Sequence, residues 1–119
     1  MGLRTDDRLI DVTQLTTDPT AVKIVNASGH KTYVKGMWFY NTDTAERVVT
    51  IYIVPDSAGS QGTAATANMH YTVTIAAGKA QWEVFPYPII LKDTNDTIQI
   101  KADSASKVNM AAYGVDEVL

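Results

Sequence analysis

The chain of 119 residues contains no cysteine, which excludes disulfide bonds, thiol nucleophiles and thiolate metal sites. Charged residues make up 19% of the chain, below the roughly 25% of an average domain. The net charge of −3 gives no basic surface for nucleic acid phosphates or anionic membranes. We therefore expect a single domain that is held by packing alone and that has neither nucleic acid nor membrane as a partner.

Long apolar runs are also missing. None approaches the roughly 20 residues that a membrane helix needs. The first ten residues, MGLRTDDRLI, lack the apolar segment of a secretory signal. These features predict a protein made in a cytosol.

Hydrophobic residues, at 45%, follow the period of β-strands. Apolar side chains occupy every second position in three segments, HYTVTIA (70–76), DTIQIKA (96–102) and KVNMAAY (107–113). Alternation with many β-branched residues is typical of strands buried on one face. Two further segments, at 31–41 and 46–54, are apolar on both faces and are predicted to be central strands or to contribute to a subunit contact. Weaker strand patterns occur at 8–15, 20–25 and 80–85.

About eight short strands, separated by Gly- and Asx-containing turns and without a convincing helix, indicate an all-β fold. The class we predict is an antiparallel β-sandwich or jelly roll with an extended N-terminal arm. Residues 1–19 would form this arm, or an edge segment exchanged between copies, and residues 20–119 a single β-sandwich domain. Within it, the small-residue segment 55–68 is predicted to be a long, mobile surface loop.

Candidate catalytic or metal-binding residues are sparse. His30 and His70 have no ligand spacing around them, so we interpret both as solvated side chains. Asp93, Asn95 and Asp96 faintly resemble part of a calcium loop but lack its glycine and distal glutamate, which favours turn capping. No nucleophile elbow and no nucleotide-binding motif occurs. We predict no enzyme activity, no catalytic residues, no metal and no cofactor.

Aromatic residues offer the best candidate contacts. Trp38 is predicted to lie in the core, because aromatic side chains bury the most area there. For Trp82 and Tyr87, core packing and exposure stay open, and exposed rings would suit a sugar or a protein partner. Tyr87 stands between two prolines, which suits an edge. The possible contact surface consists of Trp82, Tyr87, Arg4 and Arg8.

A series of strand and turn motifs follows in order along residues 30–116. Its elements are Asn41-Thr42, Val49 to Pro55, the IAAG turn at 75–78, the hairpin from Pro88 to Ala102, and a closing strand from Val108 to Val115. This series resembles small virion structural proteins of tailed bacteriophages. Residues 1–25 have no counterpart in the resemblance.

The resemblance implies a non-enzymatic part of a phage particle, assembled in the cytoplasm of the bacterial host. The leading hypothesis is a capsid decoration or cement protein that binds the major capsid protein and other copies of itself, as a dimer or trimer. Two alternatives stay open. One is a neck, tail or baseplate component that binds tail or neck proteins, and the other is a carbohydrate-binding module that recognises the host.

Overall fold

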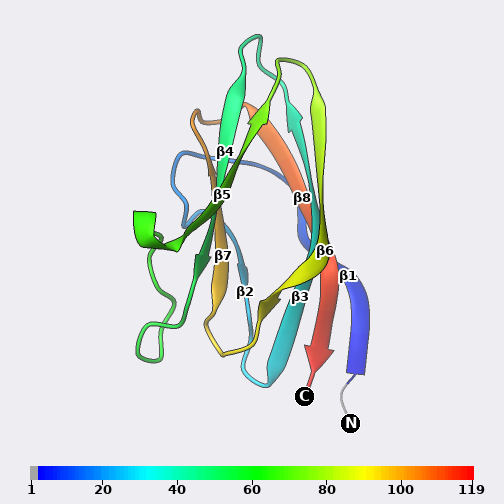
Figure 1. The fold of residues 1–119 in the computed structure, drawn as a ribbon, viewed down its shortest axis with the longest axis vertical. Helices are drawn as coiled ribbons and strands as arrows, with labels where there is room; N and C mark the ends of the chain where they lie inside the picture. The colour runs from blue at the N-terminus through cyan, green and yellow to red at the C-terminus, as the bar shows by residue number, and fades with distance from the viewer. Residues whose placement is uncertain (1–2) are drawn as a thin grey trace.

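The structure is a computed structural model that describes the backbone of residues 3–119 and the side chains of residues 7–119. This part of the chain forms eight strands and a short 3₁₀ helix, η1 (Figure 1). Their bounds are β1 (Leu3–Gln14), β2 (Val22–Val25), β3 (His30–Asn41), β4 (Arg47–Val54), η1 (Thr66–Asn68), β5 (Met69–Ile75), β6 (Ala80–Leu91), β7 (Thr97–Ala102) and β8 (Val108–Val118).

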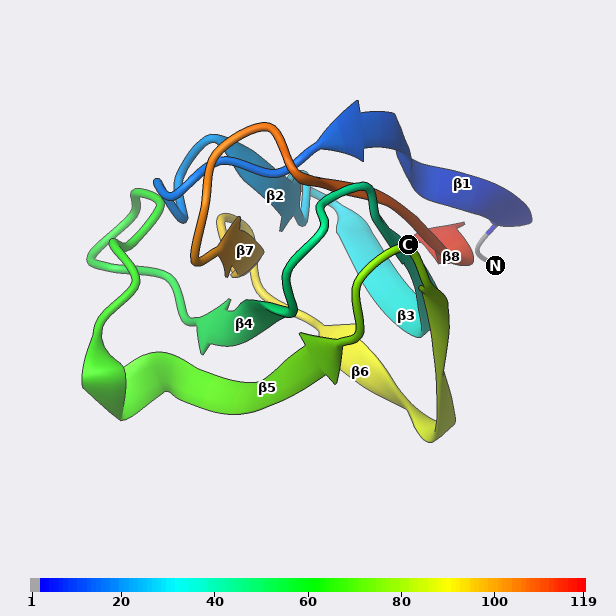
Figure 2. The ribbon, with the colours of Figure 1, turned by 90° about the horizontal axis from the view of Figure 1, so that it is seen from above.

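The strands form two four-stranded antiparallel sheets, which pack face to face as seen from above (Figure 2). One sheet has the order β1-β8-β3-β6, and the other has the order β2-β7-β4-β5. Only the connection from β4 to β5 stays within a sheet, whereas every other connection crosses to the opposite one. Eight strands wound between two sheets in this way form a jelly roll. The predicted all-β sandwich or jelly roll is therefore confirmed.

The core fills the space between the sheets with the inward side chains of each strand. Its largest fully buried members include Phe39 and Met37 from β3, Ile51 from β4, Ile100 from β7 and Met110 from β8. Burial of each such side chain contributes about 1.5–3 kcal/mol to stability. The two segments that are apolar on both faces became β3 and β4, each in the middle of its sheet, as the pattern predicted.

Two buried asparagines close the ends of the sandwich. The amide of Asn26 donates to the carbonyls of His30 and Asp93, and its oxygen accepts from the hydroxyl of Thr32. At the other end, the amide of Asn41 donates to the carbonyls of Ala45 and Ile75. Because both side chains are fully buried and bonded, they fix the turns around them.

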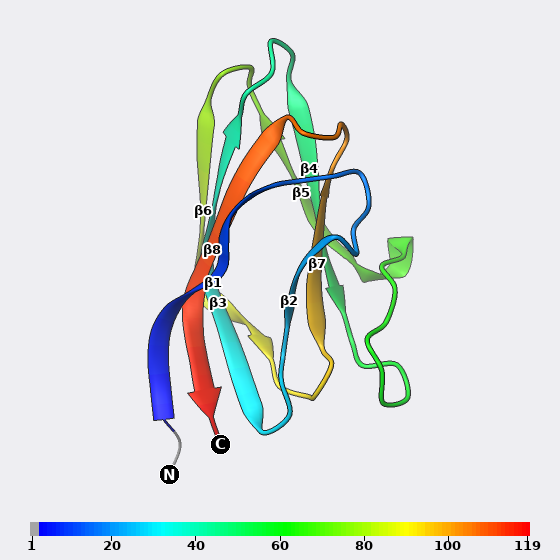
Figure 3. The ribbon, with the colours of Figure 1, turned by 180° about the vertical axis from the view of Figure 1, so that it is seen from behind.

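Residues 3–14 do not extend away from the sandwich in the single chain. They form the edge strand β1, whose register runs from Leu3 opposite Val118 to Gln14 opposite Asn109 (Figure 3). An arm was predicted because this segment is polar, but the open side of β8 provides a row of backbone groups that β1 satisfies. Exchange of the segment between copies stays a prediction.

The loop from residue 55 to residue 65 also differs from the mobile loop that we predicted. It lies on the outer side of the β2-β7-β4-β5 sheet and ends in η1 (Figure 1). The buried amide of Gln99 donates to the carbonyl of Gly62 at 2.8 Å and accepts from the N–H of Ala64 at 3.2 Å. These bonds tie the loop to β7, so it covers part of the sheet.

Strand β6 has a large irregularity in its middle. Val84 lies opposite Gly36 and Ile89 lies opposite Val34, so four residues of β6 stand against one residue of β3. Pro86 and Pro88 fall in this stretch, where the missing N–H groups cost no ladder hydrogen bonds. The bulge divides β6 into two halves and places Tyr87 at its tip.

Candidate interaction surface

The aromatic residues singled out in the sequence lie along β6, the edge strand of the β1-β8-β3-β6 sheet. Trp82 exposes 59% of its surface and Tyr87 exposes 90%. Both are therefore surface residues, which decides the question that the sequence left open. They do not form one cluster, since no ring contact joins them among the side chains of residues 7–119.

Trp38 corrects a sequence prediction. It was expected in the core, but it is only half-buried and lies on the outer face of β3, opposite Trp82 of β6 and Ala111 of β8. Its neighbour Phe39 points inward instead and is fully buried. The strand pattern is apolar on both faces here, so only the pairing of the sheets decides which ring enters the core.

Four rings gather on this outer face. Trp38 lies 6.4 Å from Trp82 and 6.5 Å from Tyr40, measured between ring centroids, and Trp82 lies 6.1 Å from Tyr113. Val84, which follows on β6, is 74% exposed. We call these five residues the aromatic face. Their spacing falls within the range in which aromatic pairs attract one another.

Glycine at position 36 helps to form the aromatic face. In the register, Gly36 of β3 stands between Tyr113 of β8 and Val84 of β6. Because it has no side chain, the outer surface of β3 is empty at this point. The rings of Trp82 and Tyr113 can therefore meet across β3, with their planes 29° apart.

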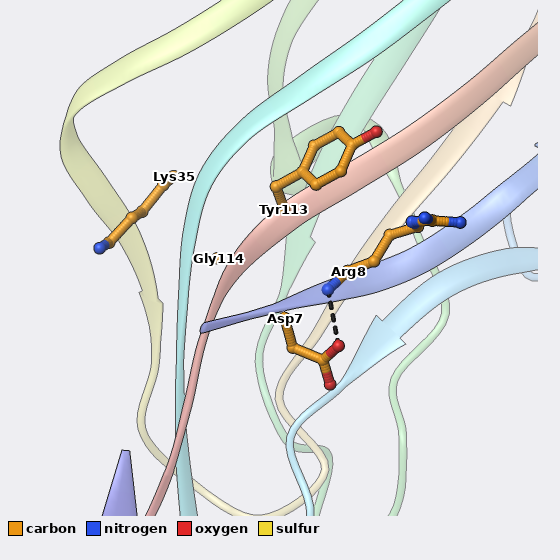
Figure 4. Close-up of a pocket in the computed structure, with 5 residues that line it drawn as sticks. All are labelled: Asp7, Arg8, Lys35, Tyr113 and Gly114. Atoms are coloured by element: carbon orange, nitrogen blue, oxygen red, sulfur yellow. Dashed lines mark hydrogen bonds between the residues drawn. The ribbon is translucent and has the colours of Figure 1, made fainter. Parts of the chain in front are cut away.

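A shallow hollow of about 590 Å³ borders the aromatic face (Figure 4). It is lined by Asp7, Arg8, Lys35, Tyr113 and Gly114, which come from β1, β3 and β8. Tyr113 belongs to both the hollow and the aromatic face. The predicted contacts Arg8 and Trp82 thus lie on one sheet, linked by a tyrosine that sequence reasoning missed.

Arg8 is held by local contacts. Its backbone N–H donates to Asp7 Oδ1 at 2.8 Å, and its guanidinium lies 3.3 Å from Asp11 Oδ1. The side chain of the other predicted arginine, Arg4, lies outside the described residues, although its Cα pairs with that of Glu117.

The histidines have different surroundings. His30 was predicted to be a solvated side chain. Instead, its Nδ1 lies 2.8 Å from Oδ1 of Asp116, which is 86 positions away in the sequence. His70 is exposed, as expected, with its ring edge-on to Tyr71. Among the side chains of residues 7–119, no group of three or more His, Cys, Asp or Glu side chains is placed to hold a metal ion.

The carboxylate of Asp96 caps a turn. It accepts hydrogen bonds from the N–H groups of Asp93, at 3.0 Å, and Asp56, at 2.9 Å. Asn95 adopts a positive φ of 71° in this turn, and its amide donates to the carbonyl of Gly59. The polar cluster 93–96 therefore serves turn geometry, as the sequence suggested.

Tyr71 of the edge strand β5 has a buried hydroxyl group. Among the residues that the structure describes, its hydroxyl finds no hydrogen-bond partner, and its ring packs edge-on against Phe85 at 6.0 Å. Burial, and secondarily the nearby charge of Glu83, raises the pKa of the hydroxyl above its ordinary value. Within residues 3–119, no helix is long and apolar enough to span a membrane.

Comparison with known proteins finds likeness in fold but not in sequence. No protein-family model and no curated protein sequence matches the chain. Among solved structures, the tobacco streak virus coat protein is 10% identical, with a TM-score of 0.48 over 98% of this chain and 84% of the other. The virus-like particle of the prawn extra small virus gives 12% identity and a TM-score of 0.47, over 98% and 78%.

A structure of infectious bursal disease virus is 14% identical, with a TM-score of 0.39. The match covers 98% of this chain but 31% of that one. At such low identity the likeness concerns the fold alone. The three structures come from a tobacco virus, a prawn virus and infectious bursal disease virus, and none is a phage protein. The jelly-roll assignment itself comes from the sheet topology of this chain.

Proposed function

We propose that this chain is a non-enzymatic structural protein of a bacteriophage particle. Its role would be capsid decoration: binding the major capsid protein and further copies of itself on the shell, after assembly in the host cytoplasm. The observation that carries the proposal is the aromatic face, in which Trp82 and Val84 are 59% and 74% exposed on one sheet. Contiguous exposed apolar surface of this kind marks sites of protein interaction.

The rigid scaffold supports the same role. Subunits of a particle bind many identical neighbours without covalent links, which favours a well-packed core that presents fixed surfaces. Here Phe39, Met37 and Met110 pack directly under the sheet that carries the aromatic face. Binding at this face therefore costs little conformational entropy, because its backbone is already ordered.

The direct test is the composition of the particle. Phage particles from the culture that produces this chain would be banded on a density gradient and analysed by quantitative mass spectrometry. The proposal expects many copies of the chain per particle, and its absence from intact particles would overturn it. Cryo-electron microscopy of the same particles would then distinguish decoration of the head from a place in the neck, tail or baseplate.

A second candidate is a carbohydrate-binding module that recognises the host. The supporting observation is the near-parallel stacking of Trp82 and Tyr113 at 6.1 Å beside the hollow at Arg8, since exposed rings can stack on sugars. Binding to a glycan array that is lost in Trp82→Ala and in Tyr113→Ala, but kept in Val12→Ala, would favour this function over pure assembly.

A further inference from the structure

Residues 80–84 form the first half of β6, which is an open sheet edge beside the aromatic face. We propose that a second copy of this chain pairs with residues 80–84 of β6 in antiparallel orientation, about a two-fold axis at Trp82. The two β1-β8-β3-β6 sheets would then form one continuous sheet. This inference rests on the proposed function, because it specifies how copies associate.

The backbone groups at this edge face outward in a defined pattern. Within residues 3–119, β6 has β3 as its only neighbouring strand, and the N–H of Asn41 donates to the carbonyl of Lys79 at 2.9 Å. Hydrogen-bonded and non-hydrogen-bonded pairs alternate in an antiparallel ladder. The backbone groups of residues 79, 81 and 83 therefore point to β3, while those of Ala80, Trp82 and Val84 point to the open side.

This pattern is complementary to itself. If Trp82 faces the partner's Trp82, then Ala80 faces the partner's Val84, and Val84 faces the partner's Ala80. Each of these pairs joins residues whose backbone groups point outward, so three pairs with two bonds each would form about six hydrogen bonds. The same register would bring the two aromatic faces together, because the outward side chains of both copies lie on the same side of the joined sheet.

The inward side chains also fit this register. Gln81 would stand opposite the partner's Glu83, and Lys79 would lie diagonal to it, within the reach of long side chains. Gln81 is exposed and Glu83 only half-buried, although both point toward the inner side. The edge therefore extends past the core and is accessible from both faces. In the proposed pair, the carboxylate of each Glu83 would lie near the amide of Gln81 and the ammonium of Lys79 of the other copy.

Of the three other edges, β1 and β2 are less suited to pairing, and β5 lies in the opposite sheet, away from the aromatic face. β1 carries Asp7, Arg8 and Asp11 and has two register shifts, both of which are devices that protect an edge. β2 has only four residues. The second half of β6 contains Pro86 and Pro88, which cannot donate backbone hydrogen bonds. Residues 80–84 have neither proline nor lysine, and this segment itself carries Trp82 and Val84 of the aromatic face.

Disulfide trapping tests the register, because the chain has no cysteine of its own. Gln81→Cys protein would be mixed with Glu83→Cys protein of a different tag length and oxidised. In the proposed register these positions form a non-hydrogen-bonded pair with Cα atoms about 4.5 Å apart, within disulfide range. We expect the mixture to cross-link. In each variant alone, the two cysteines would occupy diagonal positions about 7–8 Å apart, so no disulfide should form.

A second measurement uses matched edge variants. Trp82→Lys on β6 and Val12→Lys on β1 change side chains that are both 59% exposed, at opposite edges of one sheet. In sedimentation velocity, we expect Trp82→Lys to weaken self-association at least about tenfold, because an edge lysine opposes pairing. Val12→Lys should leave self-association unchanged. Equal effects of the two substitutions would overturn the proposal.

The outcomes separate this inference from the proposed function. Two outcomes overturn the β6 pairing and leave the virion role standing. In one, the chain associates but the mixture does not cross-link; in the other, each variant alone cross-links as well as the mixture. A chain that is present in particles but monomeric at about 100 µM also overturns the pairing alone. A chain that pairs through β6 but is absent from particles overturns the virion role instead.

Discussion

The two outer faces of the sandwich differ in how much of each is covered by other parts of the chain. The β2-β7-β4-β5 sheet is covered in part by the loop at 55–65, which hydrogen bonds to Gln99 of β7 and to Lys23 of β2. The β1-β8-β3-β6 sheet has no such cover over Trp82 and Val84, which stay mostly exposed. One face is partly covered within the chain, and the other stays exposed in the single chain.

The chemistry of the two faces follows from this difference. Under the loop, the buried side chain of Gln99 hydrogen bonds to Gly62 and Ala64 of the loop and donates to the buried hydroxyl of Thr97. A single chain can complete such a face, since hydrogen bonds are directional and local. On the open face the outward side chains are large and aromatic, which a second protein surface can bury with a larger gain.

The largest effect is expected for the core that both faces share. Replacing Phe39 with alanine should lower the free energy of unfolding by about 3–5 kcal/mol, because the ring is fully buried and leaves a cavity. Urea denaturation followed by circular dichroism measures the loss. Tyr40→Ala, one residue further along β3 on the outer face, is the matched control and should cost clearly less. Equal losses would contradict the inward and outward assignment of β3.

Gln99→Ala should have the next largest effect, through the covered face. It removes the bonds to Gly62, Ala64 and Thr97 and leaves the half-buried backbone groups of Gly62 and Ala64 without this partner, for an expected loss of about 2–3 kcal/mol. Faster proteolysis within 55–65 should accompany the loss. Gln81→Ala on the exposed edge is the control, with an expected change within about 0.5 kcal/mol. A Gln99→Ala protein as stable as this control would argue against the loop as a cover.

Trp82→Ala should affect stability less than either change. Its ring is 59% exposed in the single chain, so we expect a loss below about 1.5 kcal/mol at concentrations where the chain is monomeric. The same substitution should reduce self-association, which analytical ultracentrifugation measures. A loss of stability comparable to that of Phe39→Ala would mean that the outer face is part of the core.

The smallest effect concerns the β3–β4 connection between the two sheets. The guanidinium of Arg47, and secondarily the N–H of Thr44, hold the pKa of Asp43 below its ordinary value. In the unfolded chain this pKa returns to about 3.9. The unfolded state therefore binds the proton first as the pH falls, and the stabilisation is present above about pH 4 and lost through the lowered pKa.

Urea unfolding of the protein and of Asp43→Asn at neutral and acidic pH tests this effect. The difference in free energy of unfolding should be present near neutral pH and should shrink in acid. In an Arg47→Gln background the pH dependence of the difference should largely disappear. If it persists unchanged, Arg47 is not the partner that lowers the pKa.

Much of the fold could be predicted because strand alternation is local. The three alternating segments are strands in the structure, since one buried face imposes a period of two. The segment 70–76 corresponds to β5, the segment 96–102 to β7 and the segment 107–113 to β8. β8 runs on to Val118, beyond the segment with clear alternation. Its last residues were missed because they pair with β1 and β3, and pairing partners are distant in sequence.

The candidate surface could be predicted only in part. Trp82 and Arg8 were identified as contact residues from their types, but Tyr113 and Gly36 were not, because each matters only through its cross-strand neighbours. The pairing of His30 with Asp116 was missed for the same reason. Whether Arg4 belongs to this surface stays a prediction.

The sequence by itself determined the strands, the turns between them and a cysteine-free all-β domain, because these depend on side-chain alternation and turn chemistry within a few residues. Only the tertiary structure decided that Phe39 enters the core while Trp38 stays outside, and that β1 completes the sheet beside β8. Those choices depend on which strands pair and in which register, and a shift of one residue would reverse the faces.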